Sequence, residues 1–264
     1  MPNGLRTPFY SDFPKRLPRS PVLRTDMPVL SPQNDPMGVA IIDFLTRGTD
    51  QPLRVCSPMF DDDEIPVAHL FRTYLQMPAI EQKALDLARG HVLDVGAGAG
   101  CHSLVLQERG IDVSAIDISP LSVEAMRLRG VRHAVLQDFF LVESTYDTVL
   151  MLMNGIGMTG TLRALPRFFR HLDRLLAPGG QLLCDSSDIR YVFTDDDGQV
   201  DLPHNGYYGE LRYQMRYGQV VGKPFPWLYV DFDTLSRCAT EAGFCAERIA
   251  DGPHFDFLAR IVRQ

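Results

Sequence analysis

The sequence contains no apolar run of about 18 residues or more, the length that a membrane-spanning helix requires. Its opening stretch, MPNGLRTPFYSDFPKRLPRS, lacks the apolar core of a secretory signal. Internal repeats are absent as well. We therefore expect a cytoplasmic protein that has no membrane partner.

The sequence also lacks the spacings of cysteine and histidine that are typical of zinc sites. Its 5 cysteines form no CxxC pair, and their odd number without a secretion signal indicates reduced thiols. Acidic runs at 61–64 and 195–197 could be interpreted as metal ligands. Adjacent carboxylates repel each other, however, and are more typical of solvated loops. No metal site is predicted.

An excess of positive charge is missing too, since 26 Lys and Arg stand against 33 Asp and Glu and give a net charge of −7. Broad binding to nucleic acid depends on Lys and Arg meeting phosphates, so a nucleic-acid substrate is disfavoured. Hydrophobic residues make up 45% of the chain and charged residues 22%, as in an ordinary soluble globular protein.

The periodicity of the sequence divides the chain. Residues 1–36 hold eight prolines and predict an extended arm. Residues 37–264 are expected to form a single domain, in which 37–90 is a helical cap. Its helices are predicted at 37–47 and at 66–89, the second divided by Pro78.

From residue 91 onward, short apolar runs alternate with helical segments. Such alternation predicts parallel strands joined by right-handed crossovers, hence a doubly wound α/β sheet. Residues 186–230 interrupt the rhythm, and GELRYQMRYG within them alternates between apolar and polar residues like half of a β-hairpin. Two strands are expected to close the chain, at 245–251 and 254–262.

Three glycines follow the first strand of this region, in HVLDVGAGAG. Ligands of doubly wound sheets bind beyond the carboxyl ends of the strands, and Gly96, Gly98 and Gly100 would let the backbone pass close beneath one. Asp117 ends the next strand and could accept hydrogen bonds from ribose hydroxyls, although it could instead cap the helix that follows. A nucleoside or dinucleotide ligand is predicted.

Residues 78–185 resemble the core of the class I S-adenosylmethionine-dependent methyltransferases. VLDVGAGAG resembles the first motif of this family, AIDIS the acidic strand tip after it, and LAPGGQLL the turn before the fifth strand. The resemblance implies a seven-stranded, mostly parallel sheet whose last strand is antiparallel. It also implies S-adenosyl-L-methionine as the cofactor. The N-terminal helices and the hairpin insertion after the fifth strand are predicted from the pattern of residues alone.

The resemblance further implies a set of cofactor contacts. Asp94 and the backbone from Gly96 through Ala97 and Gly98 to Gly100 would hold the methionine portion. Asp117 would bind the ribose, Ile118 would lie against the adenine, and Asp138 would accept from the adenine amine with Phe139 nearby. His102 and Arg72 are candidates for the cofactor carboxylate, or else ordinary surface side chains.

The same resemblance implies that Asn154 lies beside the transferred methyl group. Asn154 is followed by Gly155-Ile156-Gly157 and not by the Pro-Pro-aromatic sequence of base-amino methyltransferases, which disfavours DNA as the acceptor. A general base is needed only if the acceptor arrives protonated. Asp185 is the base that we select; the other candidates are Asp188, His204, Tyr207 and Tyr208.

The function predicted from these features is methyl transfer to a small molecule by in-line displacement. Residues 186–230 would form an aromatic lid over the strand ends, unless this face packs on the sheet or on a second subunit. Two alternatives stay open: a protein that binds the cofactor without catalysis, and an NAD-linked oxidoreductase. The second would need the G-x-G-x-x-G that is missing here. The chain is expected to be a monomer or a homodimer.

Overall fold

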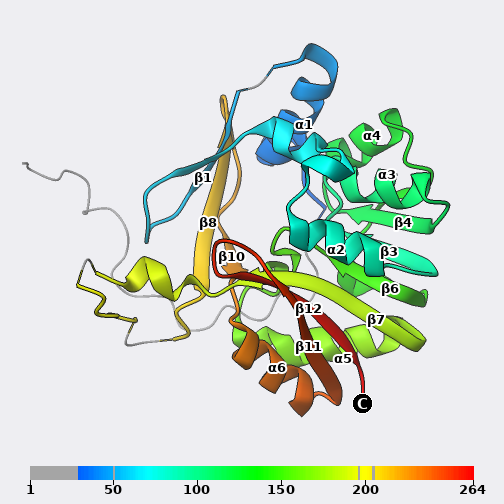
Figure 1. Ribbon diagram of the computed structural model, residues 1–264. Helices are drawn as coiled ribbons and strands as arrows, with labels where there is room; N and C mark the ends of the chain where they lie inside the picture. The colour runs from blue at the N-terminus through cyan, green and yellow to red at the C-terminus, as the bar shows by residue number, and fades with distance from the viewer. Residues whose placement is uncertain (1–28, 50, 196, 204–205) are drawn as a thin grey trace, which may run out of the picture.

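The computed structural model describes residues 29–49, 51–195, 197–203 and 206–264. The chain forms two sheets (Figure 1), of which the larger has the strand order β11-β12-β7-β6-β3-β4-β5. Its strands are β3 (His91–Val95), β4 (Asp112–Asp117), β5 (Ala134–Leu136), β6 (Tyr146–Met151), β7 (Leu176–Ser187), β11 (Phe244–Asp251) and β12 (Asp256–Arg263). Strands β3 to β7 pair in parallel, and β12 is antiparallel to both neighbours. The predicted α/β sheet is thereby confirmed.

Helices cover both faces of this sheet. They are α2 (Ala79–Leu87), α3 (Cys101–Glu108), α4 (Pro120–Leu128), α5 (Leu165–Leu175) and α6 (Phe232–Glu241). Helix α1 (Pro36–Arg47) packs instead on α4 and on β8. Consecutive residues of β6 show the two layers, since Val149 and Met151 pack in the core beneath α5 and α6, whereas Leu150 packs beneath α2 and α3. A strand that is buried on both faces explains why these runs are apolar throughout and do not alternate.

The second sheet has the order β10-β8-β1-β2, with β9 paired to β8. Its strands are β1 (Leu53–Cys56), β2 (Asp63–Ile65), β8 (Glu210–Tyr217), β9 (Val220–Val221) and β10 (Phe225–Leu228). The helical cap expected at 37–90 also contains strands that were not predicted, because β1 and β2 lie between its two predicted helices. These strands have 4 and 3 residues, too few for a period of two to stand out.

The first half of the helix predicted at 66–89 is also wrong. Val67–Phe71 and Tyr74–Gln76 form the 3-10 turns η2 and η3, and regular α-helix begins only at Ala79, after Pro78. The other 3-10 turns are η1 (Pro32–Asn34), η4 (Phe139–Leu141), η5 (Gly155–Thr159), η6 (Leu162–Ala164) and η7 (Ile189–Phe193). Residues 1–28, most of the predicted arm, lie outside the described residues.

The insertion is more firmly attached than a free lid. The predicted alternation of β8 is present, with Leu211 and Tyr217 buried and Arg212 and Arg216 exposed. Strand β8 is central in its sheet, however, and Tyr217 packs with Ala40 of α1 in a shared apolar cluster. Tyr217, with Met215 beside it, therefore packs inside the chain against α1, β1 and η2. The lid role of residues 186–230 stays a prediction.

Within the part of the chain that the structure describes, no helix is long and apolar enough to cross a membrane. In the same residues, no three His, Cys, Asp or Glu side chains come together in a way that could hold a metal ion.

Candidate functional site

The glycine turn after β3 takes up backbone conformations that other residues rarely adopt. Gly96, Gly98 and Gly100 have φ angles of +69°, +55° and +79°. A Cβ built on Gly96 would meet no atom within 4 Å, and one on Gly98 would meet only Ile41 Cδ1 at 4.0 Å. At Gly100 the Cβ would lie 2.9 Å from Val131 Cγ2. The turn thus packs tightly at its end and leaves open space at its start, where a ligand can approach.

Gly100 and Gly110 allow a matched test of this packing, because both have a φ of +79° and a Cβ on Gly110 would meet nothing within 4 Å. Each alanine variant loses about 1–2 kcal/mol through the left-handed conformation. We expect Gly100→Ala to lower the thermal unfolding midpoint by several degrees more than Gly110→Ala, because of the added overlap. Equal midpoints in differential scanning calorimetry would show that Val131 and Met126 move aside freely.

Asp117 ends β4 beside this turn and is held by two backbone amides. Its Oδ2 accepts from the Gly98 amide at 2.9 Å, and its Oδ1 accepts from the Ser119 amide at 2.8 Å. Burial raises the pKa of Asp117 to about 6, although these amides oppose the rise. The helix α4 is capped by Ser119, whose Oγ accepts from the Ser122 amide. The capping role considered for Asp117 is therefore wrong, and its remaining lone pairs can accept from a ligand.

A segment that the sequence placed in an extended arm reaches the same strand end. The Leu30 amide donates to the Ile118 carbonyl at 2.9 Å. Ser119 Oγ donates to Asp35 Oδ2 at 2.5 Å, and Asp35 also caps α1 by accepting from the Gly38 amide. Residues 29–35 therefore border the position expected for a nucleoside, a contact that no local pattern had indicated.

Three charged residues gather beneath the glycine turn. Arg72 Nη2 donates to Glu81 Oε1 at 3.1 Å and to Oε2 at 3.0 Å, and His102 Nε2 lies 2.7 Å from Glu81 Oε2. Arg72 is 7% exposed and His102 is 6% exposed, so the alternative that they are surface side chains is wrong. Nε and Nη1 of Arg72 are buried without a partner among the described residues. Such donors suit a carboxylate, the group expected there.

Neighbouring charges set the ionisation of this cluster. Burial acts to lower the pKa of His102, but Cys101, Glu81 and Asp94 outweigh it and raise that pKa well above its usual range. Asp94, which is 2% exposed, accepts from Ser103 Oγ at 2.6 Å, and burial raises its pKa. The sequence analysis predicts Asp94, Arg72 and His102 as site residues but does not include Glu81.

A signal for Glu81 was present in the sequence. It follows Ile80 and precedes Ala84 and Leu85 at spacings that share one helix face, and all of these residues are buried. An acid within an apolar helix face needs a buried cation as its partner, which could have directed attention to Arg72.

Asn154 and Asp185 meet at the carboxyl ends of β6 and β7. The backbone amide nitrogen of Asn154 donates to Asp185 Oδ1 at 3.0 Å. Met153 and Asn154 have φ angles of 59° and 55°, a strained pair that makes this contact possible. Burial raises the pKa of Asp185 to about 7, against the donation from Asn154 and with help from the charge of Glu81.

The side chain of Asn154 fastens the insertion to the site. Its Nδ2 donates to the Leu228 carbonyl at 3.2 Å, and its Oδ1 accepts from Ser186 Oγ at 3.0 Å. Ser186 Oγ in turn accepts from the Val230 amide at 3.0 Å. Asn154 is therefore engaged in positioning β7 and the chain after β10.

Two of the three residues expected near the adenine, Asp138 and Phe139, follow the end of β5. Asp138 is 3% exposed, and its Oδ1 accepts from the Phe140 amide at 2.8 Å. Phe139 is buried in the core, 5.6 Å from the ring of Phe168 and 4.9 Å from that of His171, centroid to centroid. Its side chain thus packs beneath α5, and any contact of Phe139 with adenine stays a prediction.

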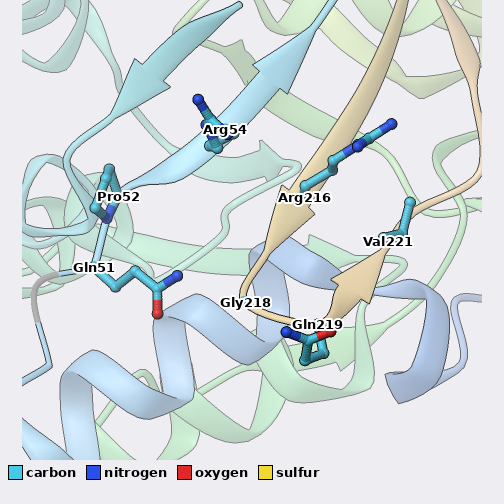
Figure 2. A pocket seen from close by; sticks show the side chains of 7 residues that line it. All are labelled: Gln51, Pro52, Arg54, Arg216, Gly218, Gln219 and Val221. Carbon is cyan, nitrogen blue, oxygen red and sulfur yellow. The ribbon is translucent and has the colours of Figure 1, made fainter.

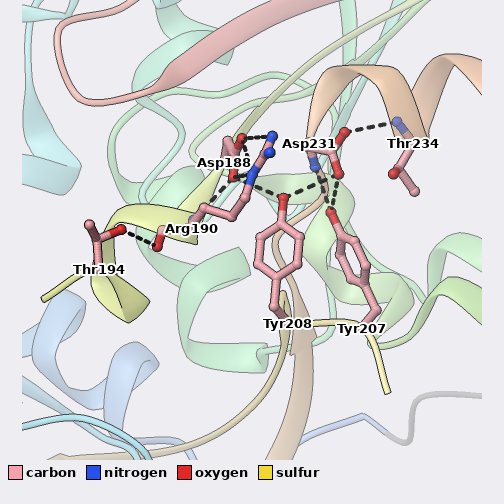
Figure 3. A network of polar contacts seen from close by, with 7 residues as sticks. All are labelled: Asp188, Arg190, Thr194, Tyr207, Tyr208, Asp231 and Thr234. Atoms are coloured by element: carbon pink, nitrogen blue, oxygen red, sulfur yellow. Dashed lines mark hydrogen bonds and ion pairs between the residues drawn. The ribbon is translucent and has the colours of Figure 1, made fainter. Parts of the chain in front are cut away.

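Three of the other candidate bases, Asp188, Tyr207 and Tyr208, belong to a network that holds the insertion (Figure 3). Asp188 pairs with Arg190 at 2.6 Å and accepts from the Tyr208 hydroxyl at 2.8 Å, and the Tyr207 hydroxyl donates to Asp231 Oδ2 at 2.6 Å. Although burial opposes it, bonding to Arg190 holds the pKa of Asp188 below its usual value. Burial raises the pKa of both tyrosines. None of these groups is suited to accept a proton near neutral pH, and His204 lies outside the described residues.

A cavity of about 390 Å³ lies elsewhere, on the smaller sheet (Figure 2). Its lining includes Arg54 of β1, Arg216 of β8, Gln51 and Gln219. None of the site residues Asp94, Asp117, Asn154 and Asp185 contributes to this lining. The cavity is therefore separate from the candidate site, which is defined by buried polar groups and strand ends.

Several known proteins resemble this chain. A family model described as a methyltransferase domain matches residues 68–247. The crystal structure of an S-adenosylmethionine-dependent methyltransferase from Bacteroides fragilis, in complex with S-adenosyl-L-homocysteine, is 53% identical. The match covers 89% of this chain and 97% of that one, with a TM-score of 0.84.

Curated relatives match a shorter part of the chain. A ubiquinone biosynthesis O-methyltransferase of Xanthomonas oryzae pv. oryzae (strain PXO99A) is 35% identical over 104 residues, 37% of this chain and 43% of that protein. A cypemycin N-terminal methyltransferase of a Streptomyces species is 34% identical over 102 residues, 37% of this chain and 42% of that protein. The chain thus spans less than half the length of these relatives.

Proposed function

The chain belongs to the methyltransferase family and uses S-adenosyl-L-methionine, and we propose that it methylates a small molecule whose acceptor atom loses its proton to Asp185. The observation that carries this proposal is the buried carboxyl of Asp185 at the carboxyl end of β7, with a pKa of about 7. A carboxylate with such a pKa is well matched to proton abstraction at neutral pH.

The described residues fit the cofactor at both of its ends. The unpartnered Nε and Nη1 of Arg72 suit its carboxylate, and Asp117 beside the open glycine turn suits its ribose hydroxyls. Ile118 and Asp138 lie at the neighbouring strand ends, where they would border the adenine. S-adenosylmethionine supplies a methyl group attached to a positively charged sulfur, so the donor is already activated.

Because the donor is activated, the chain mainly aligns the reactants and manages one proton. Alignment of reacting atoms can supply about 7–11 kcal/mol of a barrier. Asn154 holds Asp185 through its backbone amide and the insertion through its side chain, so the base and the insertion are fixed together. Asp185 takes the acceptor proton at a carboxylate oxygen, and its 8% exposure keeps competing water away.

The insertion favours a small acceptor. Leu228 and Val230 are fully buried in the core, so the intervening Tyr229 faces the opposite side of the extended chain. There its hydroxyl lies 3.5 Å from that of Tyr213 on β8. Two tyrosine rings with polar tips in the insertion suit a compact, partly aromatic or polar acceptor.

Transfer of label tests this proposal directly. We expect the protein, incubated with methyl-labelled S-adenosylmethionine and the low-molecular-weight fraction of a cell extract, to place label in that fraction. Liberated S-adenosylhomocysteine should appear in equal amount. Label confined to nucleic acid or protein fractions would contradict a small acceptor, and no label in any fraction would favour binding without catalysis. The cytoplasmic location and the monomeric or homodimeric state stay predictions of the sequence.

A further inference from the structure

Glu81 occupies the centre of the buried ion cluster. Both of its carboxylate oxygens accept from Arg72 Nη2, at 3.1 and 3.0 Å, and its Oε2 lies 2.7 Å from His102 Nε2. Glu81 itself is 4% exposed. Removal of one partner from such a cluster leaves an uncompensated charge, so Glu81 determines how both cations are held.

The pairing on the arginine side is incomplete. Glu81 engages Nη2, which also lies 3.4 Å from Met153 Sδ, while Nε and Nη1 are buried without a partner in the described part of the chain. A planar guanidinium that is fixed at one nitrogen cannot rotate freely, so its other donors keep one direction. Donors that are buried, unpaired and fixed in direction are suited to an anionic group that arrives with a ligand.

We propose that Glu81 is a positioning residue, which fixes the guanidinium of Arg72 so that its free donors receive the carboxylate of the methyl donor. This inference rests on the proposed function. Glu81 acts through Arg72. Asp117, which is expected to bind the ribose, lies on a different element, at the end of β4. We therefore expect the adenosine portion to bind independently of Glu81.

Two adenosine thioethers allow binding of the amino-acid portion to be measured apart from binding of the adenosine portion. S-adenosylhomocysteine carries the carboxylate, and 5′-methylthioadenosine lacks the whole amino-acid portion. We expect Glu81→Gln to weaken S-adenosylhomocysteine binding about tenfold or more in calorimetry, the loss typical of a hydrogen bond to a charged group. Binding of 5′-methylthioadenosine should stay within about twofold of wild type. Asp86→Asn, an exposed acid-to-amide change on the same helix, should leave both affinities unchanged.

A double variant tests whether Glu81 acts through Arg72. Glu81→Gln added to Arg72→Ala should cause no further loss of S-adenosylhomocysteine affinity beyond Arg72→Ala alone. If Glu81→Gln fails to fold, Glu81→Asp, which keeps the charge and shortens the side chain, should show the same selective loss. Equal weakening of both ligands, or full additivity with Arg72→Ala, would overturn the proposal. A wild-type protein that binds neither ligand would instead refute the proposed function.

Discussion

Replacement of Asp185 by asparagine is expected to lower kcat about 10²- to 10⁴-fold, the contribution typical of a positioned general base. Asparagine keeps the size of the side chain and an oxygen that can accept from the Asn154 amide, so the local fold should persist. It removes only the ability to take a proton. Steady-state kinetics with a methyl acceptor identified by label transfer measure the effect, and S-adenosylhomocysteine affinity should stay within about twofold of wild type.

The pH profile identifies the reason for this loss. Burial raises the pKa of Asp185 to about 7, so the carboxyl is protonated and inactive below this pH and ionised above it. The kcat of the wild type should therefore rise as the pH increases through about 7 and then level off. The residual activity of Asp185→Asn should lack this step. A variant that keeps the wild-type rate and step would show that another group, or none, removes the proton.

Asp117→Ala is expected to weaken S-adenosylhomocysteine binding about 10- to 150-fold, because a hydrogen bond to a charged group contributes about 1.5–3 kcal/mol. Both carboxylate oxygens are already oriented by the amides of Gly98 and Ser119, so no ordering of the side chain is needed when a ribose binds. The variant also loses these two internal hydrogen bonds. Part of the loss of affinity is therefore expected to come from a less ordered glycine turn.

Asp112→Ala is the control for this experiment. It removes the same side chain from the exposed start of the same strand, at the opposite end of β4. Calorimetry should find its affinity for S-adenosylhomocysteine close to that of the wild type. Equal weakening by both variants would mean that overall charge, and not a contact of Asp117, governs binding.

The larger sheet was predictable because its signals are local. Apolar runs, the glycine turn after β3 and the acidic end of β4 each lie within a few residues of the chain, and the alternation of strands and helices indicates parallel pairing. Strands β1 and β2 were missed because 4 and 3 residues carry no clear period. Strand β1 pairs with β8, which lies far along the chain, and β2 joins the sheet by pairing with β1.

The candidate site was predictable only where its residues adjoin these local signals. Asp94, Gly98 and Asp117 follow from the strand ends. Glu81 was missed because its partners Arg72 and His102 lie 9 and 21 residues away along the chain, outside its own helix. Asp185 could be selected as a candidate base, but its raised pKa depends on burial that only the folded chain provides.

The measurement that tests the central claim most directly is calorimetric titration of the wild-type protein with S-adenosylhomocysteine and, separately, with NAD. The arrangement of the glycine turn, Asp117 and Arg72 predicts one S-adenosylhomocysteine bound per chain and no measurable binding of NAD. Binding of NAD instead, or of neither compound, would contradict the assignment of this strand end as the site of the methyl donor, together with the roles that depend on it.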